Sequence, residues 1–166
     1  MRNVVFLTVF LAMTIISIST AVEVDTLQED IPMNAVYRDD ASPYFLFDRN
    51  SSFYDTFSVR NNPPLLFRKV GHFMLYGLLA AILFLFIPTK RLLIKSFLAI
   101  LLAGTIGLID EVHQYFLVSR GGRILDVYIN LLGIVSAVSA LVFFIGIIKL
   151  RRFLFAATSK WRRNVS

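Results

Sequence analysis

Three short sets of polar residues stand at the ends of apolar stretches in this sequence. Within each set the residues are three or four positions apart, which places them on one face of a helix. Imidazole and carboxylate groups act as general acids and bases, and Lys and Arg bind anions. If the sets meet, they form a site that binds a ligand or catalyses a reaction. They are Lys69, His72 and Tyr76, then Glu111 and Gln114, then Arg123, Asp126 and Asn130.

Neighbouring residues extend this picture. Asp110 and His113 form a second pair beside Glu111, and we expect them at the periphery of the site. Gly133 and Ala137 continue the third set in a small-xxx-small spacing that lets two helices approach closely. Tyr76 and Gly133 are expected on the inner rim, one turn deeper. No HExxH or similar compact motif is present, so we expect no metal and no cofactor.

The elements that carry these residues are four apolar runs. The chain of 166 residues is 57% hydrophobic and only 17% charged, with a mean hydropathy of +0.69. A helix needs about 20 mainly apolar residues to cross the hydrocarbon core of a bilayer. We therefore predict an all-α fold, a polytopic membrane bundle of four transmembrane helices, and not a soluble enzyme. The runs are Val4–Val22, Val70–Ile87, Leu92–Ile109 and Ile124–Leu150.

The charges and the missing cysteines exclude other classes of protein. The formal net charge is +6, but several basic residues flank apolar runs and no Lys/Arg stripe alternates with stacking aromatics. We expect no nucleic-acid partner, and the lipid bilayer as the main one. The chain has no cysteine, which excludes disulfides and thiolate metal sites.

The organisation along the chain follows from these runs. We expect a first transmembrane helix in residues 1–22, an acidic loop in 23–67, a three-helix core in 68–150 and a basic tail in 151–166. The loop is also rich in Tyr and Phe, which either favour the membrane–water interface or pack on the helix ends. Ser19-Thr20-Ala21 resembles a signal-peptidase site, but the apolar run continues without a polar region, so we expect an uncleaved signal anchor.

The charge distribution predicts the orientation. With the N-terminus inside, the cytoplasmic segments hold ten of the seventeen basic residues and no acidic residue, in agreement with the positive-inside rule. We expect a multi-pass cell-membrane protein with both termini in the cytoplasm and the acidic loop outside. The ten are Arg2, Lys90, Arg91, Lys95, Lys149, Arg151, Arg152, Lys160, Arg162 and Arg163.

The polar sets also resemble a known family, the VanZ-like bacterial membrane proteins. The family pattern is K-x-x-H-F-x-x-Y, then E-x-x-Q, then R-x-x-D-x-x-x-N-x-x-G, and the chain matches every position between Lys69 and Gly133. It departs in having Gly121-Gly122-Arg123 where Pro-Gly-Arg is frequent, and Ala137 where a closing glycine is expected. The resemblance implies a cell-envelope protein, with the founding member linked to low-level teicoplanin resistance. It implies no reaction.

Three functions stay open at this stage. In the first, an outward-facing pocket binds an anionic envelope lipid or cell-wall precursor. There Lys69 and Arg123 bind the phosphate, and the other ligand-binding residues, Tyr76, Gln114 and Asn130, supply hydrogen bonds. In the second, a membrane enzyme acts on a lipid or peptidoglycan intermediate. Its catalytic residues are His72 as base or nucleophile with Glu111 and Asp126, and in a subordinate form His72, His113 and carboxylates bind a metal. In the third, the polar residues only pin the helices together.

Overall fold

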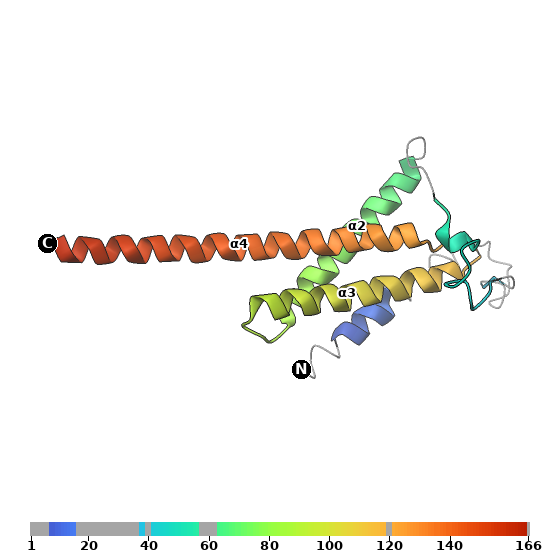
Figure 1. Ribbon diagram of the computed structural model, residues 1–166, viewed down its shortest axis with the longest axis horizontal. Coiled ribbons are helices and arrows are strands. Elements are labelled where there is room, and N and C mark those ends of the chain that lie inside the picture. The colour runs from blue at the N-terminus through green and yellow to red at the C-terminus, as the bar shows by residue number, and fades with distance from the viewer. Residues whose placement is uncertain (1–6, 16–36, 39–40, 57–62, 119–120, 166) are drawn as a thin grey trace.

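The computed structural model describes residues 7–15, 37–38, 41–56, 63–118 and 121–165, and the backbone alone over 63–64 and 157–165. Most of this part of the chain is helical (Figure 1). Three of its helices are long and apolar enough to cross a membrane: Leu65–Phe86, Leu92–Tyr115 and Ile124–Ala156. The prediction of an all-α membrane bundle is confirmed. The elements are a helix over residues 7–15, the short η2 (Ser52–Tyr54), α2 (Pro63–Phe86), α3 (Leu92–Tyr115) and α4 (Ile124–Val165).

Local sequence explains where these helices begin and end. The second helix starts at Pro63, a position in the first turn where the missing proline N–H costs nothing. It ends at Phe86, two residues before Pro88, which cannot continue a helix. In contrast, α4 runs without a break for 42 residues, roughly 63 Å at 1.5 Å per residue. Residues 151–165 of the expected basic tail therefore continue α4, which projects beyond the bundle in Figure 1.

Small residues bring α2 and α4 into close contact. A Cβ atom added to Gly133 of α4 would overlap the carbonyl of Phe73 in α2. One added to Gly77 of α2 would lie 3.0 Å from the Gly133 oxygen and 3.6 Å from the Ala137 Cβ. The expectation that Gly133 and Ala137 allow close helix approach is confirmed. The crossing brings the start of α2, the end of α3 and the start of α4 toward one end of the molecule (Figure 1).

The apolar core lies below this end, between the three long helices. Its side chains are fully buried and include Leu83, Phe84 and Ile134. The helix over residues 7–15 joins the core through Ile15, with Leu11 and Ala12 packed against it. The Ser19-Thr20-Ala21 segment lies outside the described residues.

Part of the acidic loop packs on the end of α3. Phe45 and Phe53 are buried there with Tyr115, and the rings of Phe45 and Tyr115 stack with centroids 4.1 Å apart. Tyr44 and Phe47 are instead 73% and 89% exposed. Phe45 and Phe53 therefore pack on the helix ends, and an interfacial role for the exposed Tyr44 and Phe47 stays a prediction. We call residues 41–56 the aromatic cap.

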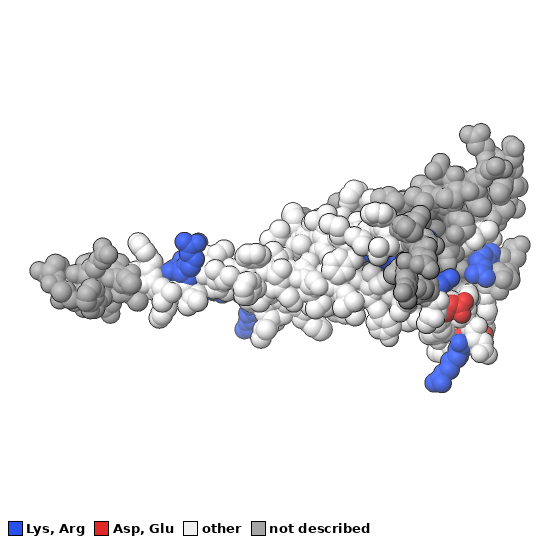
Figure 2. All heavy atoms as spheres, turned by 90° about the horizontal axis from the view of Figure 1, so that it is seen from above, with Lys and Arg blue, Asp and Glu red and all other residues white. Residues whose placement is uncertain are grey.

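Charge is unevenly distributed along the molecule. Figure 2 shows acidic side chains only at the end where the cap lies, and basic ones alone toward the projecting end of α4. This asymmetry is what the positive-inside rule converts into an orientation. The orientation itself stays a prediction.

Candidate functional site

A buried ion pair joins α2 to α4. Lys69 Nζ lies 2.5 Å from Asp126 Oδ2 and donates a hydrogen bond to it. The two residues are only 5% and 3% exposed. Lys69 lies in the second turn of α2, and Asp126 lies in the first turn of α4.

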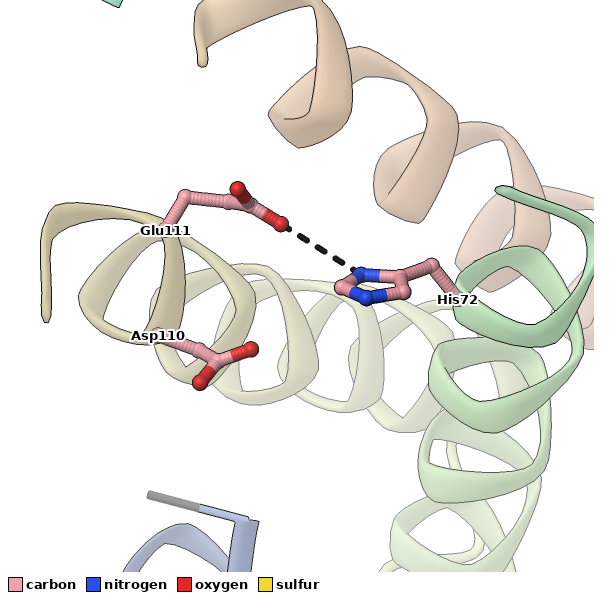
Figure 3. Close-up of side chains that lie close together, drawn as sticks. All are labelled: His72, Asp110 and Glu111. Atoms are coloured by element: carbon pink, nitrogen blue, oxygen red, sulfur yellow. Dashed lines mark ion pairs between the residues drawn. The ribbon is translucent and has the colours of Figure 1, made fainter. Parts of the chain in front are cut away.

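A second group surrounds the fully buried Glu111 of α3. Asn130 Nδ2 of α4 donates a hydrogen bond of 3.1 Å to Glu111 Oε1. His72 Nδ1 of α2 lies 3.4 Å from the same oxygen (Figure 3). Three helices thus meet at one carboxylate.

A third group lies one residue earlier on α3. Asp110 Oδ2 accepts a hydrogen bond of 2.7 Å from the Tyr76 hydroxyl and one of 2.6 Å from Gln114 Nε2. Asp110 is 2% exposed, Gln114 5% and Tyr76 0%. In Figure 3 the carboxylates of Asp110 and Glu111 both extend from α3 toward the imidazole of His72. One atom from each of these three residues lies within 4.8 Å of the others.

The sequence matches a known family model over most of its length. The family model described as VanZ/LLP1 matches residues 3–147. The chain belongs to the VanZ/LLP1 family. No curated protein and no solved structure gives a significant match.

In this VanZ/LLP1 protein the acidic side chains are distributed in an informative way. Eight of the eleven acidic residues lie in residues 23–66, and the remaining three are Asp110, Glu111 and Asp126. All three are buried at the same end of the bundle. Burying a charge is costly unless it is paired, so these three carboxylates need partners within the bundle.

Several sequence-based placements are wrong. Asp110 is not peripheral, because Tyr76 from α2 and Gln114 one turn along α3 enclose it. Tyr76 is not on a rim but wholly buried, and Gly133 packs on the backbone of Phe73 instead of facing a cavity. His113 is half-buried, and the centroids of its ring and the Tyr37 ring are 6.2 Å apart. Its partial exposure agrees with the predicted peripheral position.

Arg123 precedes α4 and is half-buried. Its neighbour Gly122 lies so close to α3 that a Cβ atom there would overlap the Glu111 carbonyl and come within 2.6 Å of the Tyr115 nitrogen. A glycine is therefore required at position 122 by this close approach to α3. The departure from Pro-Gly-Arg falls at Gly121, where an added Cβ atom would contact only the Arg123 side chain, at 3.7 Å.

The cavity beside the cluster is apolar. A groove of about 330 Å³ lies between α3 and α4. Among its lining residues, Asn130 belongs to the polar cluster. Its walls include the half-exposed Leu101 and Leu108, so it opens on the flank of the bundle. The full lining is Ile100, Leu101, Gly104, Thr105, Gly107, Leu108, Val127, Asn130, Leu131 and Ile134.

Proposed function

We propose that this VanZ/LLP1 protein binds an anionic envelope lipid or lipid-linked cell-wall precursor. The observation that carries the proposal is the groove between α3 and α4, which is lined mostly by apolar residues and includes Asn130 of the polar cluster. Its volume of about 330 Å³ is at the lower end for ligand pockets, which suits one hydrocarbon chain better than a whole amphiphile. A chain in the groove would place the head group beside the polar cluster.

The charges of the cluster limit how an anionic head group is held. Lys69 is paired with Asp126 and nearly inaccessible, so it does not serve as a phosphate ligand without breaking that pair. Arg123 is the better candidate because its side chain is half-buried at the start of α4, and guanidinium suits bidentate phosphate contacts. Binding a cell-wall precursor in this way would be the route by which such a protein influences susceptibility to teicoplanin.

The groove offers a direct test with a matched control. Gly104 lines it, and a Cβ atom there meets no atom within 4 Å, so Gly104→Leu fills the groove without displacing a helix. Gly146 of α4 has equally open surroundings and does not line the groove. Lipid that co-purifies with each variant in mild detergent is measured by mass spectrometry.

We expect wild type and Gly146→Leu to carry the same specific anionic lipid, and Gly104→Leu to lose at least about tenfold of it. Equal recovery from both variants excludes the groove as the binding site. If neither wild type nor the variants retain a specific lipid, the lipid-binding proposal fails.

One contact favours a catalytic variant of the same proposal. His72 Nδ1 and Glu111 Oε1 are 3.4 Å apart, and Asn130 holds that carboxylate from the other side. This arrangement suits a histidine base oriented by a carboxylate. The two functions differ in their response to mutation: an enzyme loses turnover in His72→Gln, whereas a binder is impaired more by Arg123→Ala than by His72→Gln.

A further inference from the structure

Among the described residues, the buried charges of the cluster are mostly carboxylates. Among the described residues the buried charged side chains are Lys69, Asp110, Glu111 and Asp126. Lys69 forms an ion pair with Asp126. Asp110 and Glu111 are consecutive residues, and both face His72 (Figure 3). A divalent cation held between two adjacent buried carboxylates would offset the cost of burying their charges.

Several buried atoms beside Glu111 lack hydrogen bonds. Within the described part of the chain, Glu111 Oε2, His72 Nδ1 and Asn130 Oδ1 are shielded from solvent and have no hydrogen-bond partner. Glu111 and Asn130 are 0% and 1% exposed. Each of these atoms can present a lone pair. A buried polar atom without a partner in a native structure requires an explanation, and a bound ion is one of them.

The distances suit metal coordination better than hydrogen bonding. His72 Nδ1 and Glu111 Oε1 are 3.4 Å apart without forming a hydrogen bond. Two ligands of a tetrahedral ion with bonds of about 2.0 Å are separated by roughly 3.3 Å. One ligand atom from each of His72, Asp110 and Glu111 lies within 4.8 Å of the others, so the three residues are close enough to share one ion.

The residues around these ligands hold them in place. Tyr76 and Gln114 both donate to Asp110 Oδ2, and Asn130 donates to Glu111 Oε1. Hydrogen bonds of this kind orient the ligands of metal sites and are needed for full affinity. The ligands come from α2 and α3, which explains why no compact metal motif is visible in the sequence.

We propose that His72, Asp110 and Glu111 form a binding site for a divalent transition-metal ion. One imidazole and two carboxylates match the ligand preferences of Zn²⁺ and Mn²⁺. The ion would neutralise the paired carboxylates and leave coordination positions for water or an oxygen of a ligand. Metal binding needs no lipid, so it stands or falls independently of the proposed lipid site.

The test uses the full-length chain in detergent micelles, stripped with a chelator and titrated with Zn²⁺ alone by calorimetry. We expect one Zn²⁺ per chain, bound at least about tenfold more weakly by His72→Gln and by Glu111→Gln. Asp55→Asn, which changes an exposed carboxylate of the loop, is the matched control and should bind as wild type does. No binding by wild type, or equal affinity in His72→Gln, would overturn the site.

Two further measurements cover the case in which those variants fail to fold. X-ray absorption at the zinc edge of wild-type protein should show imidazole and oxygen ligands at about 2.0–2.2 Å. Oxygen scattering alone would contradict the proposal. Tyr76→Phe removes the hydroxyl that donates to Asp110 but retains the buried ring that packs against Gly107. We therefore expect about 10–100-fold weaker Zn²⁺ binding by a protein that still folds. Unchanged affinity in a folded Tyr76→Phe protein would count against Asp110 as a ligand.

Discussion

Lys69 and Asp126 lie 2.5 Å apart although 57 residues separate them in the chain. The pair connects α2 to α4 just above the point where Gly77 and Gly133 bring these helices together. Because both side chains are nearly excluded from solvent, each depends on the other for a partner.

The first prediction concerns this ion pair. Lys69→Met leaves Asp126 buried without its cation, and we expect a loss of about 3–5 kcal/mol in the free energy of unfolding. The double variant Lys69→Met/Asp126→Leu removes both charges and should recover most of that loss. Unfolding in detergent or bicelles measures both variants. A double variant as unstable as the single one would show that the pair is not the source of the cost.

The second prediction concerns the helix crossing. Gly133→Ala places a methyl group against the Phe73 carbonyl, which belongs to a helix backbone and cannot rotate away. We expect destabilisation of at least about 1–3 kcal/mol, as for an overpacked core. Gly146→Ala has nothing within 4 Å and should change stability by less than about 1 kcal/mol. Melting temperatures of the two purified variants decide this, and equal values would exclude the crossing as a constraint.

The sequence predicts which residues share a helix face better than it predicts which residues they contact on other helices. Residue spacing placed Lys69 and His72 on one face of α2, and Asp126 and Asn130 on one face of α4. The structure joins them across helices. The spacing of residues along one helix does not determine which side chains of a neighbouring helix they contact. Glu111 and Gln114 share a face, yet Gln114 binds Asp110 one turn back.

The error at Asp110 has the same cause. The spacing predicts a peripheral position for Asp110, because Glu111 and not Asp110 shares a helix face with Gly107. The crossing angle of α2 lets Tyr76 reach Asp110, and Gly107 leaves room for the Tyr76 ring, which would lie 3.3 Å from a Cβ atom there. Helix crossing angles depend on tertiary packing and cannot be obtained from periodicity alone.

The third prediction concerns the aromatic cap. Phe45→Ala removes the ring stacked on Tyr115, and hydrogen exchange of the backbone amides in residues 41–56 should accelerate. The Arg38 amide, which donates to the Phe116 carbonyl at 2.8 Å, should exchange faster as well. Phe47→Ala is the control because its ring is 89% exposed and its loss costs no core contact. Equal exchange in both variants would show that the cap is held by other contacts.

The last prediction concerns orientation in the membrane. We expect both termini in the cytoplasm and the aromatic cap outside, because the opposite arrangement would place the basic end of α4 outside. The chain contains no cysteine, so a single introduced thiol is reported without background. Asn50 is a better position than Ser51, since Asn50 is exposed whereas Ser51 is half-buried and donates a hydrogen bond to the Tyr115 hydroxyl. In intact cells an impermeant thiol reagent should label Asn50→Cys, and should label Ser159→Cys only after permeabilisation. Labelling of Ser159→Cys alone in intact cells would reverse the orientation and place the cluster of His72, Asp110 and Glu111 at the cytoplasmic end.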